Sequence, residues 1–338
     1  MYIRSAIFIL YICIAVLPEN STASPKGTFQ DWLKGIRSEA LERGIPEKIV
    51  QKLLTDVKPN RRVVKRDRNQ SEFKLTLPKY RDRVITHKNI LAGREKARRH
   101  KNLLNNVSSK YGVQLRFIVS IWGIETRYGS VKANVPVIPA IATLAYDARR
   151  ERFFKKQLFA TLEMVNRGYI RSENLLGSWA GAMGQPQFMP SSYLAFAQDF
   201  DGDGRRDIWN NHGDIFASIA NYLSKHHWVP EQTWGRRVIV PRALIARLGK
   251  FKRRAAPGCR AKTSDLKWLH EWRRLGVRLP NDTLLPKRNL KASLVLPDGA
   301  RGDSFLVYSN YSAIMSYNCA HHYAITVGLL ADKIGIPK

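Results

Sequence analysis

The sequence is poor in cysteine, in acidic residues and in long apolar runs. Its 3 cysteines are too few for a disulfide scaffold or a zinc cluster. Its longest apolar run, residues 7–17, has 11 residues, whereas a membrane-spanning helix needs roughly 18 or more. Its 27 Asp and Glu stand against 57 Lys and Arg, which leaves a formal net charge of +30. A charge of this size predicts an anionic partner, such as a nucleic acid, an anionic membrane or an acidic polymer.

The remaining composition predicts a folded, mostly helical protein. The chain is 44% hydrophobic and 25% charged over 338 residues, which is typical of roughly two globular domains. Apolar residues recur at helical spacing in the segments 102–111, 114–126, 138–147, 150–167, 190–198, 214–226 and 319–333. Short strands are expected near 238–240, 293–296 and 304–308. We therefore predict a mostly α (α+β) fold, with a helical N-terminal region and a small β element late in the chain.

The first residues have the pattern of a secretory signal. Arg4 precedes the apolar run, Pro18 breaks it, and small residues follow up to Ala23. The alternative, a membrane helix, is disfavoured because the run is too short. Cys13 lacks the small preceding residue of a bacterial lipidation site, so no membrane anchor is expected. We predict a signal peptide over residues 1–23.

Most of the excess positive charge lies in two stretches. Residues 58–101 hold 16 Lys and Arg against 4 acids, and residues 236–291 hold 17 against 3. If the protein is exported, nucleic acid becomes a poor candidate for the partner, and no nucleic-acid-binding module is recognisable. An anionic polymer outside the cytoplasm fits better.

One carboxylate has the setting of a general acid. The apolar segment 113–124 leads directly to Glu125, with Trp122 and Ile124 close by in sequence. A carboxyl group beside such side chains loses hydration and tends to keep its proton, as a general acid must. Taken alone, a surface or capping role for Glu125 is at least as good an interpretation.

Residues 177–192 form a second segment with functional character. Three glycines and two prolines lie among small and aromatic residues, so the backbone can approach a bulky ligand. Trp179 and Phe188 offer apolar faces to sugar rings, and Ser178 and Gln187 offer hydrogen bonds. An ordinary loop before a helix capped by Ser191 or Ser192 is the alternative.

Together these motifs resemble the B-type family of bacterial lytic murein transglycosylases. The resemblance rests on Gly-Ile-Glu125-Thr-Arg-Tyr-Gly, Ala-Gly-Ala-Met-Gly-x-x-Gln-Phe-Met-Pro-Ser-Ser, Asp-Phe-Asp-Gly-Asp-Gly and Ala-Asn-Tyr222-Leu, in this order, and extends to Ile-Met-Ser-Tyr317-Asn318. It covers most of residues 28–338 and is weakest at 60–70 and 250–300.

The resemblance implies a lysozyme-like catalytic core that cleaves peptidoglycan. Such enzymes break the β-1,4 bond between N-acetylmuramic acid and N-acetylglucosamine and leave 1,6-anhydromuramic acid ends. Glu125 is then the single catalytic carboxylate, and no cofactor is required for the chemistry. Peptidoglycan is the implied partner, other cell-wall enzymes are expected protein partners, and the periplasm is the expected location.

The resemblance also assigns roles to individual residues. Ser178 is expected to orient Glu125, with Tyr317 and Asn318 in support. The residues expected to bind substrate are Met183, Gln187, Phe188, Tyr222, Arg149 and Arg150. The two arginines match positions near the peptide stem, where guanidinium groups pair with carboxylates. Core roles for the tyrosines and a solvated helix end for the arginines are the alternatives.

Residues 199–214 predict a loop that resembles an EF-hand. Asp199, Asp201 and Asp203 occupy loop positions 1, 3 and 5, and Gly204 occupies position 6. Position 12 is Asn210 instead of Glu. The resemblance points to Asp214 as the closing carboxylate, with Arg205 at position 7. Either a structural calcium ion, or Arg205 with Arg206, is expected to neutralise the carboxylates.

The resulting division of the chain has five parts: 1–23 signal peptide, 24–105 N-terminal helical region, 106–230 catalytic core, 231–303 basic insertion with the β element, and 304–338 C-terminal segment. Cys259 and Cys319 are expected to form a disulfide, because export permits it. Two rival functions remain. A lysozyme on the same fold would use water in place of the muramic acid hydroxyl, and a wall-binding scaffold would have a dead site.

Overall fold

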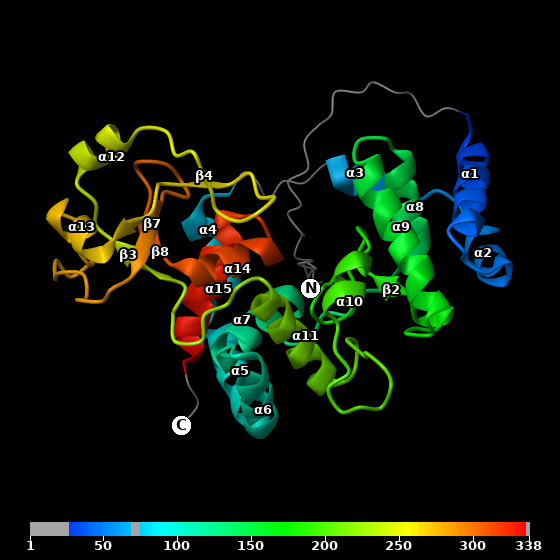
Figure 1. Ribbon diagram of the computed structural model, residues 1–338, viewed down its shortest axis with the longest axis horizontal. Helices are drawn as coiled ribbons and strands as arrows, with labels where there is room; N and C mark the ends of the chain where they lie inside the picture. The colour runs from blue at the N-terminus through cyan, green and yellow to red at the C-terminus, as the bar shows by residue number, and fades with distance from the viewer. Residues whose placement is uncertain (1–26, 69–74, 336–338) are drawn as a thin grey trace, which may run out of the picture. The chain divides into compact units, whose positions relative to one another are not determined.

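The computed structural model describes residues 27–68 and 75–335, and these fall into two compact units. The first contains residues 27–68 and 125–219, and the second contains 75–124 and 220–335. The predicted signal peptide lies outside the described residues. Among the described residues, no helix is both long and apolar enough to span a bilayer. Helices dominate both units (Figure 1), which confirms the mostly α prediction.

The first unit is built around two consecutive helices, α8 and α9, which pack on each other. Its elements are α1 (Phe29–Glu42), α2 (Glu47–Leu54), α3 (Arg61–Arg68), β1 (Val135–Pro136), α8 (Val137–Tyr146), α9 (Glu151–Asn166), the short 3₁₀ helix η2 (Ser172–Asn174), β2 (Leu176–Gly177) and α10 (Pro190–Phe196). Helix α8 has eight buried residues and packs on α9, while α3 packs on α8, and α2 and α10 pack on α9. Strands β1 and β2 pair antiparallel.

Helix α1 shows how the sequence sets an element's boundary. Thr28 is its N-cap and accepts a hydrogen bond from the Asp31 backbone N–H, while the Asp31 carboxylate accepts from the Thr28 N–H. This reciprocal pair satisfies two N–H groups that a helix start leaves open. Phe29, Leu33, Ile36 and Ala40 form the buried stripe, as their spacing predicts.

The second unit combines helices with a small sheet. Its helices are α4 (Leu77–Val84), α5 (His87–Arg99), α6 (Lys101–Tyr111), α12 (Arg242–Leu248), α13 (Leu269–Arg274), α14 (Ser309–Tyr317) and α15 (His321–Ile334). Helix α15 packs on α4, α5 and α14. Two helices cross the boundary between the units: α7 (Leu115–Thr126) and α11 (His212–Lys225).

The sheet of the second unit has the order β3–β8–β7–β6, and all neighbours are antiparallel. These strands are β3 (Gly235–Val238), β6 (Lys267–Trp268), β7 (Lys291–Val295) and β8 (Ser304–Val307); β4 (Arg253–Arg254) pairs with β5 (Lys262–Thr263). A cluster of buried residues including Leu269, Trp272 and Leu294 covers one face of the sheet. The stretch 236–291 thus shares a buried apolar core with β7 and β8, although its sequence shows little periodicity.

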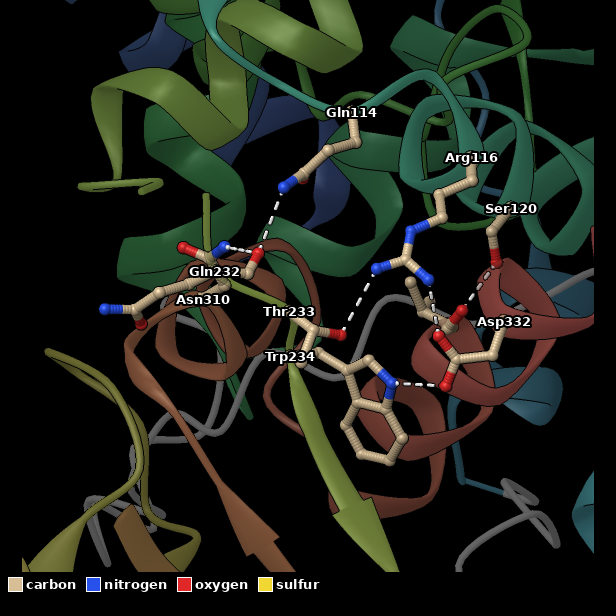
Figure 2. A network of polar contacts seen from close by, with 9 residues as sticks. Gln114, Arg116, Ser120, Gln232, Thr233, Trp234, Asn310 and Asp332 are labelled. Atoms are coloured by element: carbon tan, nitrogen blue, oxygen red, sulfur yellow. Dashed lines mark hydrogen bonds and ion pairs between the residues drawn. The ribbon is translucent and has the colours of Figure 1, made fainter. Parts of the chain in front are cut away.

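A polar network holds α7 against α15 within the second unit (Figure 2). Arg116 on α7 donates to the Asp332 carboxylate at 2.7 Å, and the indole N–H of Trp234 donates to the same carboxylate at 3.0 Å. The Ser120 hydroxyl donates to the Val327 carbonyl at 2.7 Å. Trp234 and Ser120 are buried, so these bonds satisfy polar groups that burial would otherwise penalise. They also anchor α7, whose last turn carries Glu125.

A disulfide joins Cys259 to Cys319, with the Cα atoms 5.5 Å apart. His321 lies two residues farther along. Its Nε2 atom bonds to the Lys262 carbonyl at 3.0 Å, and its Nδ1 atom bonds to the Tyr311 hydroxyl at 2.7 Å. The disulfide ties the basic stretch to the segment between α14 and α15, and the bond from His321 to Lys262 ties it to the start of α15.

Candidate active site

Glu125 lies in the last turn of α7, and only 5% of its surface is exposed. The helix is buried on all sides from Phe117 onward, so this carboxyl group is placed by a segment that has no solvated face. Directly after the helix, Arg127, Tyr128 and Gly129 have φ of 50°, 58° and 76°. Two non-glycine residues in the left-handed region are costly and tend to occur at functional sites. The chain therefore turns sharply straight after the predicted catalytic residue.

Thr126 connects this turn to the glycine-rich segment. Its hydroxyl donates to the Gln185 carbonyl at 3.1 Å and accepts from the Gly129 N–H at 3.2 Å. The Gln185 side chain in turn donates to the Trp209 carbonyl at 2.7 Å. The residue after Glu125 is thus fixed to two other segments of the first unit. Neither Thr126 nor Gln185 was predicted from the sequence, since nothing in their spacing indicates a shared bond.

The segment 177–192 is compact and held mainly by its own backbone. Met183 bridges antiparallel to both Gly177 and Phe188, with N–H to carbonyl distances of 2.8 and 3.0 Å to Phe188. Gly184 has φ of 62°, and a Cβ there would meet the Ile208 carbonyl oxygen at 2.6 Å. Glycine is therefore required at this position by both backbone conformation and space.

Ser178, predicted to orient Glu125, is 3% exposed. Its hydroxyl oxygen accepts from the Ala182 N–H at 3.1 Å and from the Ala180 N–H at 3.3 Å. Ser178 therefore closes the turn at the start of the glycine-rich segment. A bond between its hydroxyl and Glu125 stays a prediction.

The predicted substrate-binding residues of this segment are also buried. Gln187 is 4% exposed, and its side-chain amide donates to the Gly184 carbonyl at 2.8 Å. Phe188 and Met183 are 2% and 0% exposed. Direct contact of these residues with a sugar ring stays a prediction.

Arg149 and Arg150 share one buried carboxylate. Both guanidinium groups bond to Asp67 on α3, and Asp67 is 2% exposed. The Arg149 side chain is 48% exposed, whereas that of Arg150 is 13% exposed. Asp67 was not identified from the sequence. The one available signal is that it follows the apolar Val63 by four residues, on the buried face of a helix rich in arginine.

The three other residues predicted to lie near the substrate, Tyr222, Tyr317 and Asn318, belong to the second unit. The rings of Tyr222 and Tyr317 have their centroids 4.7 Å apart, and the Tyr222 hydroxyl donates to the Ser316 carbonyl at 2.7 Å. Burial raises the pKa of Tyr222 far above its usual range. Asn318 is 5% exposed and follows α14 directly. The structure thus brings Tyr222 and Tyr317 together. A shared role with Asn318 stays a prediction.

The predicted EF-hand-like loop brings three carboxylates together. Ligand atoms of Asp199, Asp201 and Asp203 lie within 4.8 Å of one another. Asp199 also accepts from the Gly202 and Gly204 N–H groups at 2.7 and 2.8 Å. Carboxylate oxygens at this spacing are the donors that calcium prefers, so the residues fit the ion.

Asp214 supports the loop from α11. It is fully buried, and its carboxylate accepts from the Phe200 N–H at 2.8 Å and the Asp207 N–H at 2.7 Å. Burial raises the pKa of Asp214 to about 6, although both N–H donors act to lower it. Asp214 is not one of the three grouped carboxylates, and its role as a calcium ligand, like that of Arg205, stays a prediction.

Comparison with known proteins places these features in context. Residues 28–332 match the family defined by the transglycosylase SLT domain. Over 266 residues the chain is 32% identical to membrane-bound lytic murein transglycosylase B of Escherichia coli (strain K12), covering 77% of this chain and 68% of that protein.

Similar solved structures support the same family. SltB3 from Pseudomonas aeruginosa in complex with NAG-NAM-pentapeptide has a TM-score of 0.82 at 39% identity, covering 91% of this chain and 79% of that one. Slt35 from Escherichia coli in complex with calcium has a TM-score of 0.74 at 28% identity, covering 94% and 98%. The resemblance that the motifs predict is confirmed.

Proposed function

The chain belongs to the lytic transglycosylase family of the SLT domain, and on that premise we propose that it cleaves peptidoglycan. It acts on the β-1,4 bond between N-acetylmuramic acid and N-acetylglucosamine and forms 1,6-anhydromuramic acid ends, for remodelling or turnover of the cell wall. The observation that carries this proposal is Glu125, a nearly buried carboxyl group at the end of an apolar helix, followed at once by a left-handed turn.

In this reaction Glu125 first acts as an acid and then as a base. Its carboxyl proton passes to the glycosidic oxygen as the bond to the muramic acid anomeric carbon breaks. The resulting carboxylate accepts the proton of the muramic acid 6-hydroxyl, whose oxygen bonds to the anomeric carbon. The proton count balances and Glu125 returns to its starting state. Thr126 and Gln185 hold the backbone behind the carboxyl group, and a placed acid is more effective than a mobile one.

A hydrolysing lysozyme would differ only in the atom that attacks the anomeric carbon. Mass spectrometry of muropeptides released from purified sacculi separates the two reactions, because anhydro ends are lighter than reducing ends by one water. We expect mainly anhydro ends from this protein. Mainly reducing ends would assign the same site to a hydrolase.

Calcium binding to the loop 199–214 is a second part of the proposal. The three grouped carboxylates support it, as does the calcium complex of the similar Slt35. The ion would stabilise the loop, because a ligand that binds only the folded state raises the stability of that state. It would take no part in bond breaking. We expect calcium to raise the melting temperature of the wild type and to leave that of Asp201→Asn/Asp203→Asn unchanged. Equal melting curves of the wild type with calcium and with chelator would favour neutralisation by Arg205 and Arg206.

The location and the remaining contacts complete the proposal. The protein acts in the periplasm after removal of residues 1–23, and N-terminal sequencing of protein from a periplasmic extract tests this. We expect Arg149 and Arg150 to approach the peptide stem. Tyr222, Tyr317 and Asn318 are expected to lie beside the bound glycan. Asp67 supports the arginine assignment, because it holds both guanidinium groups in place.

A further inference from the structure

We propose that a cavity in the first unit, beside Gln185, binds a peptide through its carboxylate groups. This inference rests on the proposed function and deepens it, because peptidoglycan carries peptide stems rich in carboxylates. The cavity has a volume of about 790 Å³ and is lined by residues of the segments 129–133, 168–176, 184–185 and 205–210. None of the residues assigned above to the peptide stem lines it.

The charge of the lining selects the ligand. Lys132, Arg171, Arg205 and Arg206 all contribute to the wall. Among residues 27–68 and 75–335, none of these four side chains forms an ion pair. Unpaired cations are expected in a chain with a net charge of +30. These four converge on one concave site, where their fields add.

Asp207 is the single acidic residue in the lining. Its carboxylate accepts from the backbone N–H groups of Trp209 and Asn210 at 2.9 and 3.0 Å. It is therefore already engaged by its own loop, and it leaves the four cations free to meet an anion from solution. A neutral sugar would not explain four cations, whereas a ligand with two or more carboxylates does.

The cavity also has apolar surface suited to small side chains. The Arg206 guanidinium stacks on the Tyr169 ring at 4.5 Å, which holds its charge at the wall at little further entropic cost. Val131, Ala133 and Ile170 add aliphatic surface. Cationic groups beside small apolar patches fit a peptide that alternates alanine with acidic residues better than they fit an inorganic anion.

The cavity is joined to the catalytic helix by shared residues. Gln185 and Gly129 are part of its wall, and Thr126 bonds to both of them. A Cβ on Gly129 would clash with the Gln185 side-chain oxygen, so the wall is tightly packed here. A bound peptide would thus rest against the segment that follows Glu125.

The test measures binding to the catalytically inactive Glu125→Gln protein, which prevents turnover. Three probes are used: a disaccharide with its stem peptide, the same disaccharide without the stem, and the free stem peptide. Lys132→Gln/Arg171→Gln removes two cations from the cavity. Lys48→Gln/Lys156→Gln is the matched control, because both residues are exposed helix positions of the same unit and lie outside the cavity.

We expect the cavity variant to bind both stem-containing probes roughly tenfold more weakly, as the loss of two partly exposed charge contacts predicts. Binding of the stem-free disaccharide to the cavity variant, and binding of every probe to the control variant, should be unchanged. The affinity difference between the cavity variant and the parent protein should shrink with added salt.

If the free stem binds as tightly as the stem-bearing disaccharide, the ligand is the peptide alone; weaker binding identifies the glycan-linked stem. Equal losses in cavity and control variants, or an equal loss for the stem-free probe, would overturn the inference. Release of anhydro ends by the wild-type protein tests the proposed function separately.

Discussion

The glycine-rich segment 177–192 and the basic stretch 236–291 are held together by different forces. In the first, short-range backbone bonds link Gly177, Met183 and Phe188, and close approaches leave no room for side chains at glycine positions. In the second, Trp272 belongs to a buried apolar cluster that also includes Leu294 and Leu306, which lie outside the stretch. A segment whose geometry is local can be interpreted from its sequence, whereas one that depends on distant partners cannot.

The basic stretch also relies on links to the C-terminal helices. The Trp272 indole N–H donates to the Ala292 carbonyl at 3.0 Å, and the disulfide reaches Cys319 from Cys259 across 60 residues. Changes in the glycine-rich region should therefore affect catalysis and local packing. Changes in the basic stretch should affect global stability and leave the chemistry intact.

Glu125→Gln should have the largest effect. Glutamine keeps the shape but can neither donate the proton nor take it back, so the rate should fall on the order of 10²–10⁴-fold or more. Ser178→Ala should lower the rate less, since the carboxyl group remains. Release of anhydromuropeptides from sacculi measures both rates, and a thermal melt checks folding. A folded Glu125→Gln protein with a rate close to wild type would exclude Glu125 as the acid.

Loss of the disulfide should be the largest stability effect. Cys259→Ser/Cys319→Ser should lower the free energy of unfolding by roughly 4 kcal/mol, because it releases a long loop in the unfolded chain. Urea unfolding in the presence and absence of reductant measures this. Two free thiols per chain in denatured, unreduced wild-type protein would contradict the bond.

Gly184→Ala should destabilise the protein more than Gly249→Ala in the basic stretch. Both glycines have positive φ, at 62° and 59°, but only Gly184 has atoms close to the added methyl group. Gly249 combines φ 59° with ψ −147°, a backbone region that essentially only glycine occupies, so we expect a loss of about 1–3 kcal/mol there from strain alone. At Gly184 the crowding should add about 1–3 kcal/mol to the strain. Chemical denaturation of the two variants gives the comparison. Equal losses would show that strain, and not space, requires glycine at Gly184.

His321 should make stability depend on pH in a modest way. Burial lowers its pKa to about 4 from 6.5, although the bond to the Lys262 carbonyl acts to raise it. The unfolded chain therefore binds a proton at a higher pH than the folded one, and stability should fall as the pH drops from about 6.5 to about 4.

The ring keeps some solvent access, so we expect a loss of about 1–2 kcal/mol, less than the full shift would give. Urea unfolding at several pH values should show this fall in the wild type and a smaller one in His321→Asn. Identical pH profiles would assign the acid sensitivity to other groups.

The helices and strands show which elements the local sequence pattern can predict. The spacing of apolar residues predicted helices over 114–126 and 319–333, and the structure has Leu115–Thr126 and His321–Ile334. The strand expected over 238–240 lies instead at Gly235–Val238, because pairing with Ser304–Val307 sets its register. Helix α13, Leu269–Arg274, was missed: it has six residues and only two buried side chains, too short for a periodic signal.

The sequence alone determined the family, the mostly α fold and the candidate carboxylate, because motif order and apolar spacing are properties of neighbouring residues. Only the tertiary structure decided that Asp67 holds Arg149 and Arg150, and that Gln185 braces the residue after Glu125. The tertiary structure also brings Lys132, Arg171 and the pair Arg205 and Arg206, from three separate segments, to the wall of one cavity. Such contacts join positions tens of residues apart, and the packing that brings them together leaves no local trace in the sequence.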